Sequence, residues 1–438
     1  MRGRWLAAAV VLGLVLRLGF ALGYWVGKPL TLDEQEYLLL ARGIASGRGF
    51  VYPAVAGEGA AVVHFERPPV YPALLAAVLV ATNHPWAAAP ARASDPVPLP
   101  LSSSDIPRAI LVFQSLIGAA GIWLISRIAS RAAGPRAGVV AACAAAVSPP
   151  LVWSCGYALS EVLYSGLALL TAVLLLVVDG GGPGAGGRKR RFAGVPTALA
   201  GGVVAGLAVL TKEGMLLFLP LAGLWLLARR RWFPAATLTA AVVVALAPWV
   251  ARNYAVHHRF VLTAAHGGVT FWTGNNPLAR GEGDLAANPE MKRARNALEA
   301  AHPGASAQVM DAVYYGEAFR FIRGRPLDWA LLEAKKLFYT VVPIGPSYLL
   351  HSRLYLAGSW LPYVVLAPFA AIGLARLGRR ATRLWPVLLL AASVVIMNLA
   401  FFPQERFRIP IIDPALIICA SACVAARQAG EAGIPDTL

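Results

Sequence analysis

Long apolar runs recur along the chain, and each is close to the roughly 20 residues that cross the hydrocarbon core of a bilayer. Polar or basic connections separate them. The first run is interrupted by Arg17 and lacks a convincing small-x-small cleavage site, so we expect a retained helix rather than a signal peptide. The pattern predicts an all-α polytopic membrane protein with about 10 transmembrane helices, near residues 5–26, 109–126, 137–153, 158–178, 194–211, 214–228, 233–250, 354–375, 384–402 and 409–426.

Two long connections, 27–108 and 251–353, hold most of the polar sequence outside these runs. The apolar run 70–81 in the first connection is too short to span comfortably, and counting it as a span would invert every later loop. We therefore predict that it forms a helix lying in the membrane interface. The second connection holds a polar region, 281–307, and an amphipathic stretch, 328–338, which we expect to lie along the membrane.

Composition excludes a soluble enzyme, because 58% of the residues are hydrophobic and 14% are charged, against roughly 45–50% and 25% in an ordinary soluble domain. The net charge of +17 is divided unequally between the two sides of the predicted membrane. With the N-terminus inside, the short inner connections hold clusters of Arg, whereas the short outer turns hold Lys212, Arg406 and Arg408. This distribution sets topology and argues against nucleic-acid binding, which needs a basic patch with interleaved aromatic residues.

The predicted protein is an integral plasma (inner) membrane protein with both termini cytoplasmic and both long loops extracytoplasmic. Residues 1–426 form a single transmembrane domain, with 27–108 as its first outer loop and 251–353 as its second, and 427–438 form a short cytoplasmic tail. The four cysteines form no C-x-x-C pair and fall within or beside apolar segments. We interpret them as small core residues.

The first candidate site follows the first span, where Thr31 to Glu34 fits the capping box S/T-x-x-E. A helix is predicted from here to about Ser46, with Gly47 as its C-terminal stop. Asp33 then lies in the first turn, where the helix dipole favours its ionised form, one turn before Tyr37. The alternative is that both acids merely cap a surface helix, and for Glu34 this alternative is strong.

A second candidate pair lies further along the same loop, where Glu66 and Arg67 immediately precede Pro68 and Pro69. The prolines fix φ and disfavour helix before them, so the carboxylate and the guanidinium are held on stiff, extended backbone. A plain salt bridge at the water boundary is the competing interpretation.

Several short motifs in this order resemble the GT-C glycosyltransferases, and within them most closely the branch of the protein O-mannosyltransferases and lipid A aminoarabinose transferases. The resemblance runs from about residue 5 to 426. The motifs are Asp33 and Glu34 with Tyr37, 65–72 (FERPPVYP), Ser160 with Glu161, 210–213 (LTKE), 248–253 (PWVARN), 275–277 (NNP) and 406–410 (RFRIP).

The resemblance implies transfer of a hexosyl or pentosyl unit, with inversion, from a polyprenyl-phosphate donor to a lipid, glycan or protein on the extracytoplasmic face. It implies that Asp33 is the base that takes the acceptor's proton. Cations would stabilise the leaving phosphate. The implied substrate-binding residues are Arg67 and Arg252, with Lys212, Arg406 and Arg408 as companions, the acids Glu66 and Glu161 lining the cavity, and Glu34 and Tyr37 beside Asp33.

The sequence also bears on metal binding and on the expected partners. No cofactor is required by the resemblance. His257, His258 and His266 lie where they could approach Glu66 and hold a divalent ion, but such loose spacing is poor evidence. The expected partners are the polyprenyl-phosphate-sugar donor, membrane lipids and an acceptor, and not nucleic acid.

Two other classes remain open. A flippase or transporter of lipid-linked sugars also needs many helices and phosphate-binding arginines, but transporters tend to have repeated halves and ionisable residues at the bilayer midplane. Here Arg17 is the only charge well inside a predicted span. A ligase of preassembled glycan chains shares the donor class but should not need Asp33 near the first helix.

Overall fold

A computed structural model describes residues 2–51, 67–88, 102–180, 194–258, 260–263, 267–283 and 285–424. Within these ranges the chain is helical, and the only β pairing is an isolated bridge between Pro29 and Ser102. The helices are α1 (Arg2–Gly19), α2 (Leu32–Ala45), α3 (Val70–Ala81), α4 (Arg108–Ala133), α5 (Pro135–Val147), α6 (Pro149–Trp153), α7 (Glu161–Gly180), α9 (Val195–Val209), α10 (Phe218–Ala228), α11 (Trp232–His257), α12 (Gly267–Gly274), α13 (Pro289–Ala300), α14 (Ala307–Gly324), α15 (Pro326–Val341), α16 (Arg353–Leu377), α17 (Trp385–Ala400), α18 (Glu405–Arg408) and α19 (Ile412–Ser421).

Six of these helical segments are long and apolar enough to cross a bilayer: Gly3–Tyr24, Arg108–Ala133, Glu161–Gly180, Trp232–Val256, Arg353–Leu377 and Arg380–Ala400. A seventh span is a pair of helices, Pro135–Val147 and Pro149–Gly156, bent by 62° at their junction. The three remaining predicted spans coincide with shorter apolar helices, Val195–Val209, Glu213–Ala228 and Ile412–Val424. The total of about ten therefore stays a prediction.

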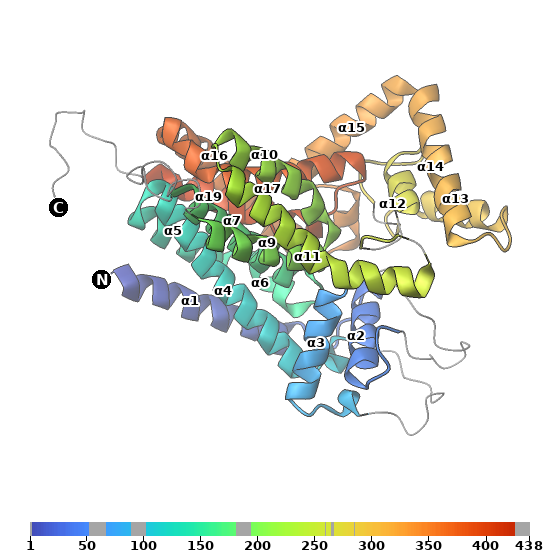
Figure 1. Cartoon of the computed structure of the whole chain (residues 1–438), viewed down its shortest axis with the longest axis horizontal. Coiled ribbons are helices and arrows are strands. Elements are labelled where there is room, and N and C mark those ends of the chain that lie inside the picture. The colour runs from blue at the N-terminus through green and yellow to red at the C-terminus, as the bar shows by residue number, and fades with distance from the viewer. Residues whose placement is uncertain are drawn as a thin grey trace.

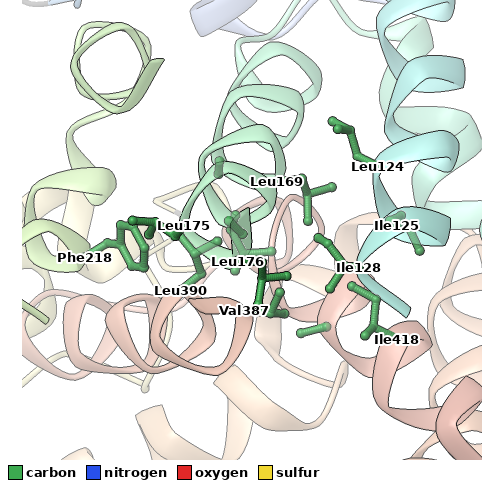
Figure 2. Close-up of a cluster of buried hydrophobic side chains, with 14 of the residues drawn as sticks. Leu124, Ile125, Ile128, Leu169, Leu175, Leu176, Phe218, Val387, Leu390 and Ile418 are labelled. Carbon is green, nitrogen blue, oxygen red and sulfur yellow. The ribbon is translucent and has the colours of Figure 1, made fainter. Parts of the chain in front are cut away.

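The apolar core lies where several of these helices meet. Figure 2 shows side chains from α4, α7, α10, α17 and α19 converging on one cluster: Leu124, Ile125, Ile128, Leu169, Leu175, Leu176, Phe218, Val387, Leu390 and Ile418. Small residues allow neighbouring helices to approach closely, as is common in membrane bundles. On α9, a Cβ added to Gly202 would lie 2.5 Å from the Leu238 carbonyl oxygen of α11.

Both long connections gather at one end of the bundle (Figure 1). There α3 packs between α2 and the start of α4, and α12 to α15 extend beyond α17. We call this the loop end. The stretch 328–338 falls within α15, whereas 89–101 in the first connection and 181–193 between the fourth and fifth predicted spans lie outside the described residues.

Two sequence predictions at the loop end are confirmed. Thr31 caps α2: its hydroxyl accepts from the Glu34 amide at 3.3 Å, and Glu34 accepts from the Thr31 amide at 2.9 Å. The chain leaves this helix through Gly47, whose φ of +79° favours glycine. The short run 70–81 forms α3, a separate 12-residue helix, and its place in the membrane interface stays a prediction.

Two boundaries differ from prediction. The span predicted to end at 250 continues as α11 through Pro248 to His257, so Arg252 lies within the helix rather than beyond its end. A proline removes one backbone hydrogen bond, and neighbouring helices compensate for that loss in a membrane bundle. The span predicted to begin at 158 begins at Glu161, since residues 149–160 form the bent second half of the preceding span and a turn.

Candidate active site

A cavity of about 390 Å³ opens at the loop end, within the size range of small-molecule sites. Its wall comes from α2, the segment before α3, the turns before α7 and α10, α12, and the residues after α17. Six predicted site residues line it: Asp33, Tyr37, Arg67, Glu161, Lys212 and Arg406. The structure thus brings together residues that are up to 373 positions apart in sequence.

Asp33 is held between two arginines. Its Oδ1 accepts from Arg67 Nη2 and its Oδ2 from Arg406 Nη1, so each carboxylate oxygen has its own guanidinium. Burial disfavours the charged form of Asp33, but Arg406 and Arg67 outweigh burial and hold the pKa well below its usual range. Asp33 is therefore ionised, and it pairs with two cations that would also attract a phosphate.

Arg67 is fixed from several directions. Its Nε donates to Glu36 Oε2 at 2.7 Å, and its guanidinium carbon lies 5.4 Å from the centre of the Tyr37 ring. The amide of Val70 donates to the carbonyl of Leu210 at 3.0 Å, which ties the start of α3 to the end of α9. Glu36 was missed by the sequence analysis, although its position three residues after Asp33 places both acids on one helix face.

Tyr37 faces the same cavity from within α2. Its hydroxyl lies 3.3 Å from Ser160 Oγ, and its ring packs edge-on against Tyr71. Burial raises the pKa of Tyr37 to about 12. The hydroxyl is thus neutral and serves as a hydrogen-bonding group.

A second ion pair lines the same cavity. Lys212 Nζ donates to Glu161 Oε1 at 2.6 Å, and its ammonium lies 4.7 Å from the centre of the Phe407 ring. Glu161 begins α7 and Lys212 follows α9, so the pair joins the ends of two adjacent helices. The other oxygen of Glu161, Oε2, is buried without a hydrogen-bond partner among the described residues.

Glu34 does not line the cavity. It is 1% exposed, and besides capping α2 it accepts from the amide of Ala158 at 3.0 Å. Burial raises its pKa, while the amides of Thr31 and Ala158 act in the opposite direction. Gln114 supports the same segment by donating to the carbonyl of Tyr157 at 2.9 Å. Glu34 therefore positions the segment that leads into Ser160 and Glu161.

The remaining predicted residues lie apart from the cavity lining. The guanidinium of Arg252 packs on the rings of Trp249 and Phe50 and donates to the Phe50 carbonyl at 3.4 Å. Arg408 is 2% exposed and its Nε lies 3.1 Å from Asp413 Oδ1. Glu66 lies outside the described residues.

An aromatic wall was also missed by the sequence analysis. Phe401, Phe402 and Phe407 line the cavity beside Met397. They follow or end α17, where a sequence read for apolar spans merges them with the membrane segment. The only signal was the RFRIP motif, which contains Phe407 and follows the other two.

The NNP motif holds this wall in place. Asn275 donates to the carbonyl of Ala400 at 2.9 Å and accepts from Lys336 at 3.0 Å. Gly274 approaches the same wall so closely that an added Cβ would lie 1.6 Å from the Phe401 carbonyl oxygen. The second loop therefore packs directly against the residues that follow α17.

Most of the residues weighed as metal ligands lie outside the described structure, so that prediction stays untested. Glu66 and His266, and the side chain of His257, lie outside it. The described residues hold no group of three or more His, Cys, Asp or Glu side chains arranged to bind a metal ion.

Comparison with known proteins agrees with this architecture. Residues 103–252, about a third of the chain, match the family described as dolichyl-phosphate-mannose-protein mannosyltransferase. No curated protein matches the chain.

The chain is similar to solved structures of membrane enzymes. The archaeal oligosaccharyltransferase AglB from Archaeoglobus fulgidus, in complex with an inhibitory peptide and a dolichol-phosphate, aligns over 96% of this chain and 50% of its own, with 14% identity and a TM-score of 0.58. ArnT from Cupriavidus metallidurans, bound to undecaprenyl phosphate, aligns over 96% of this chain and 77% of its own, with 16% identity and a TM-score of 0.45. The chain spans about half the length of the oligosaccharyltransferase.

The fold therefore defines the class. The chain is an integral membrane protein with the GT-C fold, the fold of glycosyltransferases that use lipid-linked donors. The GT-C fold that the sequence motifs predicted is confirmed.

Proposed function

We propose that the protein transfers a sugar from a polyprenyl-phosphate donor to an acceptor, with inversion, in the cavity at the loop end. The observation that carries this proposal is Asp33 held between Arg67 and Arg406 in that cavity. The site combines an anion suited to accept a proton with cations suited to bind a phosphate. The dolichol-phosphate bound to the similar oligosaccharyltransferase supports the donor class.

The reaction is a single displacement at the anomeric carbon. An acceptor hydroxyl attacks that carbon from the face opposite the phosphate, and its proton passes to Asp33. The bond between the anomeric carbon and the phosphate oxygen breaks, and its electron pair remains on the departing polyprenyl phosphate. One displacement inverts the configuration.

The arginines change partners during the cycle. Without donor they neutralise Asp33, which keeps the carboxylate ionised but weakens it as a base. A donor phosphate competes for Arg67 and Arg406, and the loss of their positive charge from Asp33 raises the pKa of its carboxyl. Donor binding thereby prepares the base for proton transfer.

Glu161 and Lys212 complete the cavity. The ammonium of Lys212 is a third cation within reach of a bound donor, and Glu161 holds it in place. Three side-chain cations thus line the cavity, and they supply the positive charge that a departing phosphate requires. We propose that no metal is needed and expect transfer to persist in the presence of a chelator.

Transfer is tested by incubating purified protein with a panel of radiolabelled polyprenyl-phosphate monosaccharides and cell-envelope extract. We expect one acceptor fraction to gain label, and to gain none with Asp33→Asn. A transport assay on the same sample, reconstituted in vesicles, distinguishes the flippase alternative. Donor movement across the bilayer without transfer would refute the proposal.

The orientation is a second part of the proposal, with the loop end outside and both termini inside. In a cysteine-free background, an impermeant thiol reagent applied to sealed, right-side-out cells should label a cysteine at Ala301 and miss one at Thr382. Both positions are exposed, at opposite ends of the bundle. Labelling at Thr382 and not at Ala301 would show that the orientation is the reverse of the proposed one.

A further inference from the structure

The bend in the span formed by α5 and α6 leaves two backbone carbonyls without their usual partners. In a continuous helix the amides of residues 149 and 150 would donate to the carbonyls of Ala145 and Ala146, four residues earlier. Both positions are proline, so both donors are missing. The span bends by 62° at this junction. An unsatisfied carbonyl within the hydrocarbon region costs several kcal/mol, so another donor is required.

The guanidinium of Arg17 supplies these donors. Its Nη2 lies 3.2 Å from the Ala145 carbonyl oxygen, and its Nη1 lies 3.4 Å from that of Ala146 and 2.9 Å from that of Gly13. The side chain is 1% exposed. It also meets the C-terminal end of α5, where the helix dipole favours a positive charge. A glycine on α4 makes the room, since a Cβ on Gly118 would lie 2.9 Å from Arg17 Nε.

A small inner cavity lies between this cap and Glu161. Its volume is about 30 Å³, enough for about two water molecules. Arg17, Ser154, Ser165 and Glu161 line it, and Glu161 also lines the large cavity. The buried Glu161 Oε2 and Arg17 Nε form no hydrogen bond with the described residues, although the weakly accepting thiol of Cys155 lies beside the guanidinium.

We propose that Arg17 is a positioning residue for Glu161. It replaces the two amide protons that Pro149 and Pro150 lack, and through water in the inner cavity it shares a hydrogen-bonded network with Glu161 Oε2. The proposal rests on the proposed function only in treating the cavity at the loop end as the reaction site. Arg17 thus belongs to the scaffold that positions Glu161 in the cavity. This role differs from that of an ionisable residue in the path of a transporter.

The capping role is tested by hydrogen exchange of the backbone amides in residues 151–161. Each charge-assisted hydrogen bond contributes about 1.5–3 kcal/mol, so Arg17→Met is expected to accelerate exchange there by at least about tenfold. Arg17→Lys should give a smaller change, because it keeps the charge but loses the planar fork.

A compensating variant separates capping from general damage. Combining Arg17→Met with Pro149→Ala and Pro150→Ala restores the two backbone donors, so it should fold and slow the exchange again even if Arg17→Met alone does not fold. Unchanged exchange in Arg17→Met, or a triple variant that neither folds nor restores protection, would overturn the capping role.

The link to Glu161 is tested by a double-mutant cycle on the thermal midpoint. Arg17→Met and Glu161→Gln should be non-additive, because they share the water of the inner cavity. The matched control combines Arg17→Met with Asp179→Asn, at the far end of α7 where Asp179 pairs with Arg229, and should be additive. Additivity in both cycles would overturn the link. These measurements need no transfer assay, so they are independent of whether the proposed transferase activity exists.

Discussion

Replacing Asp33 by Asn should strengthen the binding of polyprenyl phosphate and lower turnover. The amide keeps the size of the side chain but does not accept the acceptor's proton, and loss of a general base typically lowers the rate by about 10²–10⁴. The same change releases Arg67 and Arg406 from their ion pairs with Asp33. We therefore expect polyprenyl phosphate to bind more tightly to Asp33→Asn than to the native protein, while turnover falls at least a hundredfold.

The size of the binding effect follows from the contacts that the phosphate must displace. Two charge-assisted hydrogen bonds join Asp33 to the arginines, each worth about 1.5–3 kcal/mol. Solvent screens part of this, since the side chains of Asp33 and Arg406 are 19% and 37% exposed. Counting one bond at its lower value gives about 1.5 kcal/mol, or roughly tenfold tighter binding.

Binding is measured by titrating polyprenyl phosphate into nanodisc-embedded protein and following tryptophan fluorescence, and turnover by transfer of radiolabel. Glu290→Gln is the matched control, because Glu290 is an exposed acid on the second loop paired with Arg280, away from the cavity lining. It should change neither quantity. Weaker phosphate binding in Asp33→Asn, or turnover near the native value, would refute the reasoning.

Three further changes test other parts of the site. Glu34→Ala is expected to lower the thermal midpoint and turnover more than Glu34→Gln, because Gln can still complete the capping box; equal effects would remove its positioning role. Arg406→Gln removes one of the cations that hold the pKa of Asp33 down and leaves burial to raise it, so the acid limb of kcat/KM should move to higher pH; an unmoved limb would exclude Asp33 as the base. Arg67→Ala should weaken binding of polyprenyl phosphate more than Arg252→Ala, because Arg252 does not line the cavity, and the reverse order would restore Arg252 as the main phosphate ligand.

Much of the fold was predictable because its signals are local. The capping box fixes the start of α2 through residues three positions apart, and apolar run length predicts the long helices. Run length also kept 70–81 apart as a short helix. Pro248 shows the limit of local reasoning: its missing amide disfavours helix before it, yet α11 continues through it to His257.

The site was predictable in its residue types and less so in its partners. Asp33, Arg67 and Arg406 were all identified by resemblance, yet no local pattern indicates that one carboxylate binds both arginines. Glu36 and Glu34 show the same difficulty. They are neighbours on one helix, but tertiary contacts turn Glu36 toward Arg67 and Glu34 toward Ala158.

The contact between Arg17 and α5 also constrains the order in which the protein can be assembled. The carbonyl of Ala145 is synthesised 128 residues after Arg17, which takes roughly 6–25 s at typical ribosomal speeds. Until then the guanidinium of α1 lacks its two acceptors on α5, and a charged arginine costs about 2.5–3.5 kcal/mol at the centre of an inserting helix and less toward its end. The position of α1 is therefore fixed only after α5 has joined it.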